Sequence, residues 1–155
     1  MAIVIALVLT VSLAACGFSP PSYAQQGTSE MPFVTVDKGF ASGIRGRKLI
    51  AIRTEKEWKD LWYEHTSISD PSLPVPPVDF HREMILVAFA GEKPSGGYRI
   101  EILEITEDSA RRELRVRFVE FAPPPGAMVS AALTQPYHIV KLKRSGLPAI
   151  FVPQR

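Results

Sequence analysis

The sequence predicts an α+β fold, namely a mainly antiparallel β-sheet, barrel-like or sandwich-like, with one packed amphipathic helix. Three observations lead to this class. One segment has helical periodicity behind a capping signal, one apolar run has the length of a buried strand, and several short segments alternate apolar with polar residues. Turns rich in glycine and proline separate these segments, as is usual between antiparallel strands.

The helix is predicted to begin after Thr54. The segment 54–57, Thr-Glu-Lys-Glu, has the form of a capping box, in which a threonine oxygen and a glutamate three residues later satisfy free backbone N–H groups. One face then carries Trp58, Leu61, Trp62 and His65 at helical spacing. Burial of the tryptophans against a sheet is favoured over an exposed aromatic platform, because their large apolar surfaces are costly to leave in water. His65 is expected to be a hydrogen-bonded histidine at the helix end.

The central strand is predicted at 84–90, Met-Ile-Leu-Val-Ala-Phe-Ala, because a continuous apolar run of this length is typical of a strand buried on both faces. The turn Gly96-Gly97 permits a tight reversal into a strand that starts at Tyr98. Within that strand the apolar phase changes after residue 102, which predicts a β-bulge near Leu103.

Further short strands are expected at 33–36, 48–52, 114–118, 135–142 and 149–152. The segment 127–133 fits either a short helix or a strand, and its pattern does not decide between them. The segment 69–79 contains four prolines and is expected to be a stiff, extended connection rather than a recognition ligand.

The N-terminal segment predicts export. Residues 2–15 form an uncharged, predominantly apolar run. It is too short for a bilayer core, which needs about 20 residues, and is suited to the apolar core of a secretory signal. The run ends in Leu-Ala-Ala-Cys, and Cys16 is the only cysteine of the chain. This arrangement resembles the lipobox of bacterial lipoproteins, in which the cysteine is acylated and becomes the new N-terminus. Cleavage after Ala24 is the competing alternative. No Lys or Arg precedes the run, which predicts a coding sequence that begins upstream of Met1.

Three regions follow from these signals. Residues 1–15 are predicted to be a signal peptide, 16–32 a lipidated flexible tether rich in Ser, Pro, Gln and Gly, and 33–155 a single folded domain. By resemblance to Gram-negative lipoproteins, Gly17 in place of aspartate gives no signal for retention at the inner membrane. We therefore expect an envelope lipoprotein that faces the periplasm or the surface, at the outer membrane.

Composition excludes several functions. Eighteen basic and sixteen acidic residues give a net charge of only +2, without the clustered positive charge that nucleic-acid binding needs. With Cys16 committed to lipid, the mature domain has neither a thiol nucleophile nor a disulfide. Neither Ser42 nor Ser95 lies in a Gly-x-Ser-x-Gly motif. The three histidines show no spacing typical of metal ligands, although a site assembled from Asp79, His81 and His138 is a minor alternative. We expect no enzyme activity, cofactor or metal; a hydrolase would need a nucleophile and a base brought together by the fold.

Several segments in order resemble the C-terminal domain of the PrcB family. These are Asp79-Phe80, the apolar strand, the loop Gly91-Glu92-Lys93-Pro94-Ser95-Gly96-Gly97-Tyr98, Pro124-Pro125-Gly126, and Thr134-Gln135-Pro136-Tyr137-His138-Ile139-Val140. The family is named after a lipoprotein subunit of a surface protease complex. The resemblance covers about residues 79–143 and implies a non-catalytic accessory module attached to the cell envelope, with no particular protease as its partner.

The expected function is therefore protein–protein interaction, with Pro94, Ser95, Gly96, Gly97, Tyr98, Pro136 and Tyr137 as the contact surface. These glycines and prolines fit a purely turn-forming role equally well. The alternative function is a peptidase inhibitor, because the loop from Pro94 to Tyr98 is similar to the loop that chagasin-type inhibitors insert into cysteine peptidases.

Overall fold

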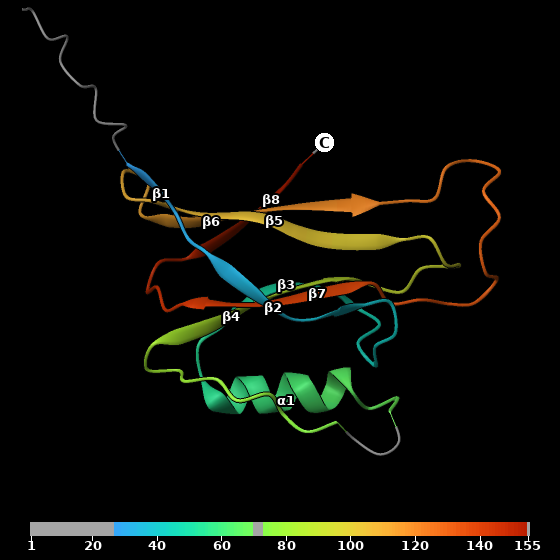
Figure 1. The fold of residues 1–155 in the computed structure, drawn as a ribbon, viewed down its shortest axis with the longest axis horizontal. Coiled ribbons are helices and arrows are strands. Elements are labelled where there is room, and N and C mark those ends of the chain that lie inside the picture. The colour runs from blue at the N-terminus through green and yellow to red at the C-terminus, as the bar shows by residue number, and fades with distance from the viewer. Residues whose placement is uncertain (1–26, 70–72, 155) are drawn as a thin grey trace, which may run out of the picture.

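The computed structural model describes residues 27–69 and 73–154. It contains two four-stranded sheets and one helix in three layers (Figure 1). The elements are β1 (Thr28–Glu30), β2 (Phe33–Gly39), β3 (Arg47–Ile52), α1 (Glu55–His65), β4 (Glu83–Ala90), β5 (Arg99–Asp108), β6 (Glu113–Phe121), β7 (Tyr137–Lys143) and β8 (Ala149–Pro153). The prediction of a mainly antiparallel α+β fold is confirmed, and of the two closures that the sequence left open, the chain adopts the sandwich.

The strand order is β1-β5-β6-β8 in one sheet and β2-β7-β4-β3 in the other. All pairs are antiparallel except β6 with β8. The chain passes from the first sheet to the second between β1 and β2, so one nearly continuous segment borders both sheets. The register shifts between Ile102 and Glu104, which places the predicted bulge at Leu103.

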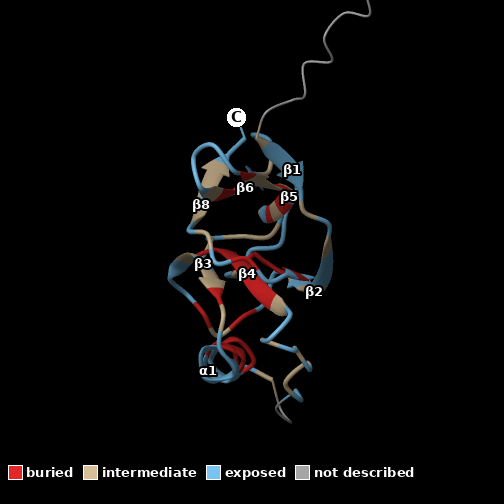
Figure 2. Cartoon of the chain, turned by 90° about the vertical axis from the view of Figure 1, so that its left-hand side faces the viewer, coloured by how far each residue is buried: buried red, intermediate tan, exposed pale blue. Residues whose placement is uncertain are grey.

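Strand β4 is buried on both faces, as its apolar run predicts. Met84, Leu86 and Ala88 belong to the core between the two sheets, whereas Ile85, Val87 and Phe89 belong to the core under the helix. Figure 2 shows this strand buried between the layers. Alternate side chains of one strand thus contribute to two separate cores.

The helix begins as the capping box predicts. The Thr54 side chain accepts a hydrogen bond from the backbone N–H of Glu57, and the Glu57 carboxylate receives the Thr54 hydroxyl at 2.8 Å. Trp58 and Trp62 are buried against the sheet, as expected. Their indole N–H groups donate to the carbonyls of Pro76 and Leu73, so residues 73–76 are held beside both rings.

Two sequence expectations are corrected. Residues 28–30 were assigned to the tether, but they pair with Asp108, Glu107 and Thr106 of β5, and Met31 packs against the core. The folded part therefore begins before Phe33. The segment 127–133 forms neither a helix nor a strand but part of a long loop. Its Ser130 carbonyl accepts the backbone N–H of Gly96 in a neighbouring turn, rather than a bond from a paired β-strand.

His138 connects the two sheets. Its Nδ1 accepts from the backbone N–H of Ile102 in β5, beside the bulge, and its Nε2 lies 2.9 Å from the Thr35 hydroxyl in β2. Since Nδ1 accepts, the ring proton is on Nε2 and is donated to Thr35. Burial lowers the pKa of His138 to about 4.

Within the described residues, no helix has the length and apolar character needed to cross a membrane. The signal peptide, Cys16 and most of the tether lie outside these residues, so the structure bears on none of the predictions made for them.

Candidate functional site

Three loops meet at one end of the sandwich, at the right of Figure 1. They are loop 40–46 between β2 and β3, loop 91–98 between β4 and β5, and loop 122–136 between β6 and β7. The described chain begins, with β1, at the opposite end. This arrangement places segments far apart in the sequence around one surface.

Loop 91–98 is held along its length by loop 122–136. Lys93 and Thr134 exchange two backbone hydrogen bonds, and the Thr134 hydroxyl donates to the Ser95 carbonyl at 2.7 Å. The Gly96 N–H donates to the Ser130 carbonyl at 3.0 Å. A β-carbon on Gly96 would lie 2.6 Å from the Ser130 hydroxyl, so a larger residue here would force the Ser130 side chain to move.

Loop 40–46 is fixed by three backbone bonds. The Phe40 carbonyl accepts from the N–H of Gln135, the Arg45 carbonyl accepts from that of Glu92, and the N–H of Gly43 donates to the His65 carbonyl at the end of α1. A β-carbon on Gly43 would lie 2.3 Å from the Glu64 carbonyl oxygen, which only glycine avoids. The helix end therefore positions this loop beside the other two.

The three loops enclose a pocket of about 520 Å³, which we call the loop-end pocket. It is lined by Phe40, Ala41, Gly96, Gly97, Tyr98, Arg99, Ser130, Ala132, Leu133 and Thr134. Phe40 and Leu133 are 67% and 62% exposed, although both are large and apolar. Exposed apolar side chains gathered around a hollow are typical of a binding surface.

Arg99 supplies the positive charge of this pocket. Its guanidinium stacks on the Phe121 ring at 4.5 Å. Within the described residues no carboxylate lies within 4.0 Å of it, whereas the nearby Lys93 and Lys38 pair with Glu120 and Glu101. The pocket thus combines an apolar interior with one cationic group that is free to meet a carboxylate.

The structure separates the predicted contact residues into two groups. Gly96, Gly97 and Tyr98 line the pocket, and Pro94 and Ser95 precede them in the same loop. Pro136 and Tyr137 are buried, so their assignment to the contact surface was wrong. Tyr137 is only 7% exposed and packs in the core under the helix.

A partly buried hydrogen-bond network explains the position of Tyr137. Its hydroxyl donates to the Asp37 carboxylate at 3.1 Å, and the His65 Nε2 donates to the same oxygen at 3.1 Å. The bond from His65 holds the pKa of the Asp37 carboxyl below its usual range, while burial and the Asp37 charge raise the pKa of the Tyr137 hydroxyl. His65 is thus buried and hydrogen-bonded, as its place on the helix predicted.

Ser42, His65 and Asp37 have the residue types of a catalytic triad, but their geometry is structural. The Ser42 hydroxyl lies 2.8 Å from His65 Nδ1 and also accepts from the Ile44 N–H. Ser42 is only 2% exposed and does not line the loop-end pocket, so a substrate has no access to its oxygen. The network joins α1, β2, β7 and loop 40–46.

The minor alternative of a metal site is also contradicted. Both ring nitrogens of His138 are in hydrogen bonds within the core, so they are not available as ligands together with Asp79 and His81. In the part of the chain that the structure describes, no group of three or more potential His, Cys, Asp or Glu ligands is close enough to hold an ion.

Sequence reasoning missed Phe40, Arg99 and Leu133. Phe40 carried a usable signal, because a large apolar residue between glycine and alanine in a turn has no strand to bury it. Arg99 and Leu133 carried none, since their meeting depends on the pairing of β5 with β6 and on the course of loop 122–136.

Fold and pocket together define a β-sandwich module with a helix on one face and an apolar, loop-built pocket at one end. Residues 84–143 match the family model described as PrcB C-terminal. Over the part of the chain from β4 to β7, this match confirms the resemblance seen in the sequence. No curated protein and no solved structure matches the chain.

Proposed function

We propose that this chain is a non-catalytic accessory protein, attached to the cell envelope through Cys16, that binds an extracytoplasmic protein through the loop-end pocket. The partner is a protease or another member of a protease complex. The observation that carries the proposal is the pocket itself, where Phe40 and Leu133 are exposed around an apolar hollow of about 520 Å³. The family match supports an accessory role.

The rim chemistry favours a particular kind of contact. A bulky apolar side chain fits the interior between Phe40 and Leu133, and a carboxylate beside it would pair with Arg99. Because the three loops are held to one another by backbone bonds, the pocket is largely formed before a partner arrives.

The same bonds favour this function over a peptidase inhibitor. An inhibitory loop has to enter the active site of its target. Loop 91–98, which contains the segment from Pro94 to Tyr98, is instead bonded to loop 122–136 at Lys93, Ser95 and Gly96. Inhibition of a papain-like peptidase by micromolar protein would nevertheless reverse this preference.

Replacing Leu133 with aspartate is expected to abolish partner binding while leaving the domain folded. The side chain is exposed, so the substitution should change the free energy of unfolding by no more than about 0.5 kcal/mol. The measurement is crosslinking in intact cells followed by mass spectrometry. Ile68→Asp, at an exposed apolar residue after α1, is the matched control. An identical set of crosslinked proteins for wild type and Leu133→Asp would contradict the proposal.

The anchor is tested separately. Replacing Cys16 with serine removes the proposed acylation site. Because several acyl chains are needed for firm attachment, the protein is expected to move from the membrane fraction to the soluble periplasmic or extracellular fraction. Mass spectrometry of the N-terminal peptide should find acyl groups on Cys16 in the wild type. An unmodified N-terminus that begins after Ala24 would contradict the lipid anchor and support the competing cleavage site.

A further inference from the structure

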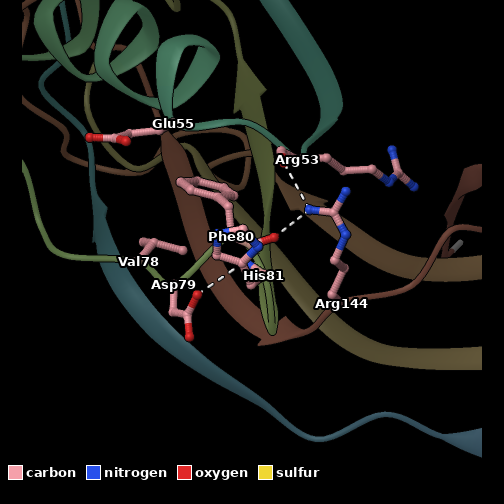
Figure 3. A pocket seen from close by; sticks show the side chains of 7 residues that line it. All are labelled: Arg53, Glu55, Val78, Asp79, Phe80, His81 and Arg144. Atoms are coloured by element: carbon pink, nitrogen blue, oxygen red, sulfur yellow. Dashed lines mark hydrogen bonds between the residues drawn. The ribbon is translucent and has the colours of Figure 1, made fainter.

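A second pocket lies at the opposite end of the sandwich from the three loops. It has a volume of about 510 Å³ and is lined by residues 78–81 together with Arg53, Glu55 and Arg144 (Figure 3). Arg53 follows β3, residues 78–81 precede β4, and Arg144 follows β7. We call this hollow the arginine pocket.

Main-chain carbonyls hold both arginines in place. Arg53 donates from Nε to the Ser145 carbonyl at 3.1 Å and from Nη2 to the Leu147 carbonyl at 2.6 Å. Arg144 donates from Nη1 to the carbonyls of Arg53 and Phe80, the two dashed lines that meet at its guanidinium in Figure 3. These bonds fix the side chains without neutralising their charge.

Each guanidinium keeps donors for a ligand. A guanidinium has five N–H donors, and Arg144 uses only those on Nη1 for the two carbonyls. Its Nε and Nη2 therefore form a free planar fork. Such a fork matches two oxygens of a phosphate or carboxylate group, and a fork that is already positioned loses less side-chain entropy on binding.

The charges in this pocket are not balanced around the arginines. The pocket has two carboxylates, and both have other partners. The Glu55 Oε1 lies 2.6 Å from the Lys59 Nζ. The Asp79 Oδ2 lies 3.9 Å from the Arg82 Nε, and its Oδ1 accepts the backbone N–H of His81. Across residues 27–69 and 73–154, no carboxylate lies within 4.0 Å of a guanidinium nitrogen of Arg53 or Arg144, although the Glu57 carboxylate accepts the backbone N–H of Arg53 at 3.3 Å. Two arginines thus line the hollow, and neither guanidinium is in an ion pair with a carboxylate of the described residues.

We propose that the arginine pocket binds a phosphate group through the free fork of Arg144, with Arg53 adding a second positive charge. Two cations in one hollow suit a phosphate oxyanion better than a single carboxylate. The volume leaves space for a substituent on the phosphate. The described chain also begins at this end of the sandwich, where an N-terminal lipid anchor would bring a membrane close. The phosphate is therefore either free or part of a phospholipid headgroup.

The test is a titration of the full chain in phosphate-free buffer, with NMR amide shifts and the melting temperature as readouts. The probes are inorganic phosphate and glycerophosphoglycerol, the headgroup of phosphatidylglycerol without acyl chains. Either probe should shift the amide signals of His81 and Arg144 and raise the melting temperature. A stronger response to inorganic phosphate indicates a free ligand, and a stronger response to glycerophosphoglycerol indicates a lipid. No saturable response to either probe would overturn the proposal.

Arg144→Gln should weaken phosphate binding by about tenfold or more, whereas Arg82→Gln, at an exposed arginine nearby that lines no part of this pocket, should leave it unchanged. Because Arg144 also holds two carbonyls, Arg144→Lys is the second variant, which keeps the charge and loses the fork. It should bind with intermediate affinity. Binding by Arg144→Lys or by folded Arg144→Gln that equals wild type would overturn the proposal.

Discussion

Replacing Trp58 with alanine is expected to lower the free energy of unfolding by about 3–5 kcal/mol. Trp58 is only 1% exposed and belongs to the core between α1 and the β4 sheet. Its ring lies 5.1 Å from that of Trp62, and its indole N–H donates to the Pro76 carbonyl at 2.9 Å. The substitution would leave a cavity in this core and remove the hydrogen bond that holds Pro76 against the helix.

The measurement is urea unfolding followed by circular dichroism. Tyr63→Ala is the matched control, because Tyr63 is an aromatic residue on the exposed face of the same helix, and its removal should cost no more than about 0.5 kcal/mol. Trp58→Phe keeps most of the apolar surface and loses the bond to Pro76, so its loss should be intermediate. Equal losses for Trp58→Ala and Tyr63→Ala would show that the helix is not a principal part of the core.

The elements predicted correctly are those with local signals. The capping box at Thr54 and the spacing of Trp58 and Trp62 depend on residues within one or two helical turns. The bulge at Leu103 is visible in the sequence because one extra residue reverses the side of the strand on which apolar residues fall. Strand β4 is recognisable because only a strand covered on both faces can be apolar throughout.

The errors arise where long-range contacts decide. Pro136-Tyr137 follows a loop and precedes a strand, a context that favours exposure, but Tyr137 reaches Asp37, which lies in β2. Strand β1 is only three residues long and polar, so nothing in its own sequence indicates that it pairs with the far end of β5. The parallel pairing of β6 with β8 is likewise set by the course of the chain after β7.

The candidate site was predicted in part for the same reason. Loop 91–98 was identifiable from its glycines, which report a tight turn or a close approach whatever the rest of the fold does. Its partners Phe40 and Leu133 come from loops that are distant in sequence, and the Gly96 N–H to Ser130 carbonyl bond that joins two of these loops has no local signature. The sequence therefore identified the loop, but not the pocket that this loop forms with its two neighbours.

Acidification from about pH 7 to about pH 4 is expected to destabilise the fold through His138. Burial lowers the pKa of this residue to about 4, against about 6.5 in an unfolded chain. Above pH 6.5 neither state binds the proton, and stability is unaffected. Between about pH 6.5 and about pH 4, His138 is protonated in the unfolded chain but not in the folded chain, so the free energy of unfolding falls as the pH is lowered.

The total loss of stability expected from this residue is about 3 kcal/mol, because each unit of difference between the two pKa values corresponds to about 1.36 kcal/mol. The structural reason is specific: a proton on Nδ1 would face the Ile102 N–H, which already donates to that nitrogen, inside the core between the sheets. Asp37, whose pKa is also lowered, loses its contribution only below the usual range of a carboxyl group, so the two effects occupy different pH windows.

His138→Asn separates them. An asparagine oxygen can still accept from Ile102 but does not titrate, so the variant should be less stable than wild type at about pH 7, through loss of the bond to Thr35, and should lose the pH dependence between about 6.5 and 4. His81→Asn, at an exposed histidine, should retain it. Urea unfolding across this range gives the answer. Asparagine does not take up a proton in this range. If His138→Asn nevertheless kept the wild-type pH dependence, the acid sensitivity would come from another residue, and the prediction for His138 would be wrong.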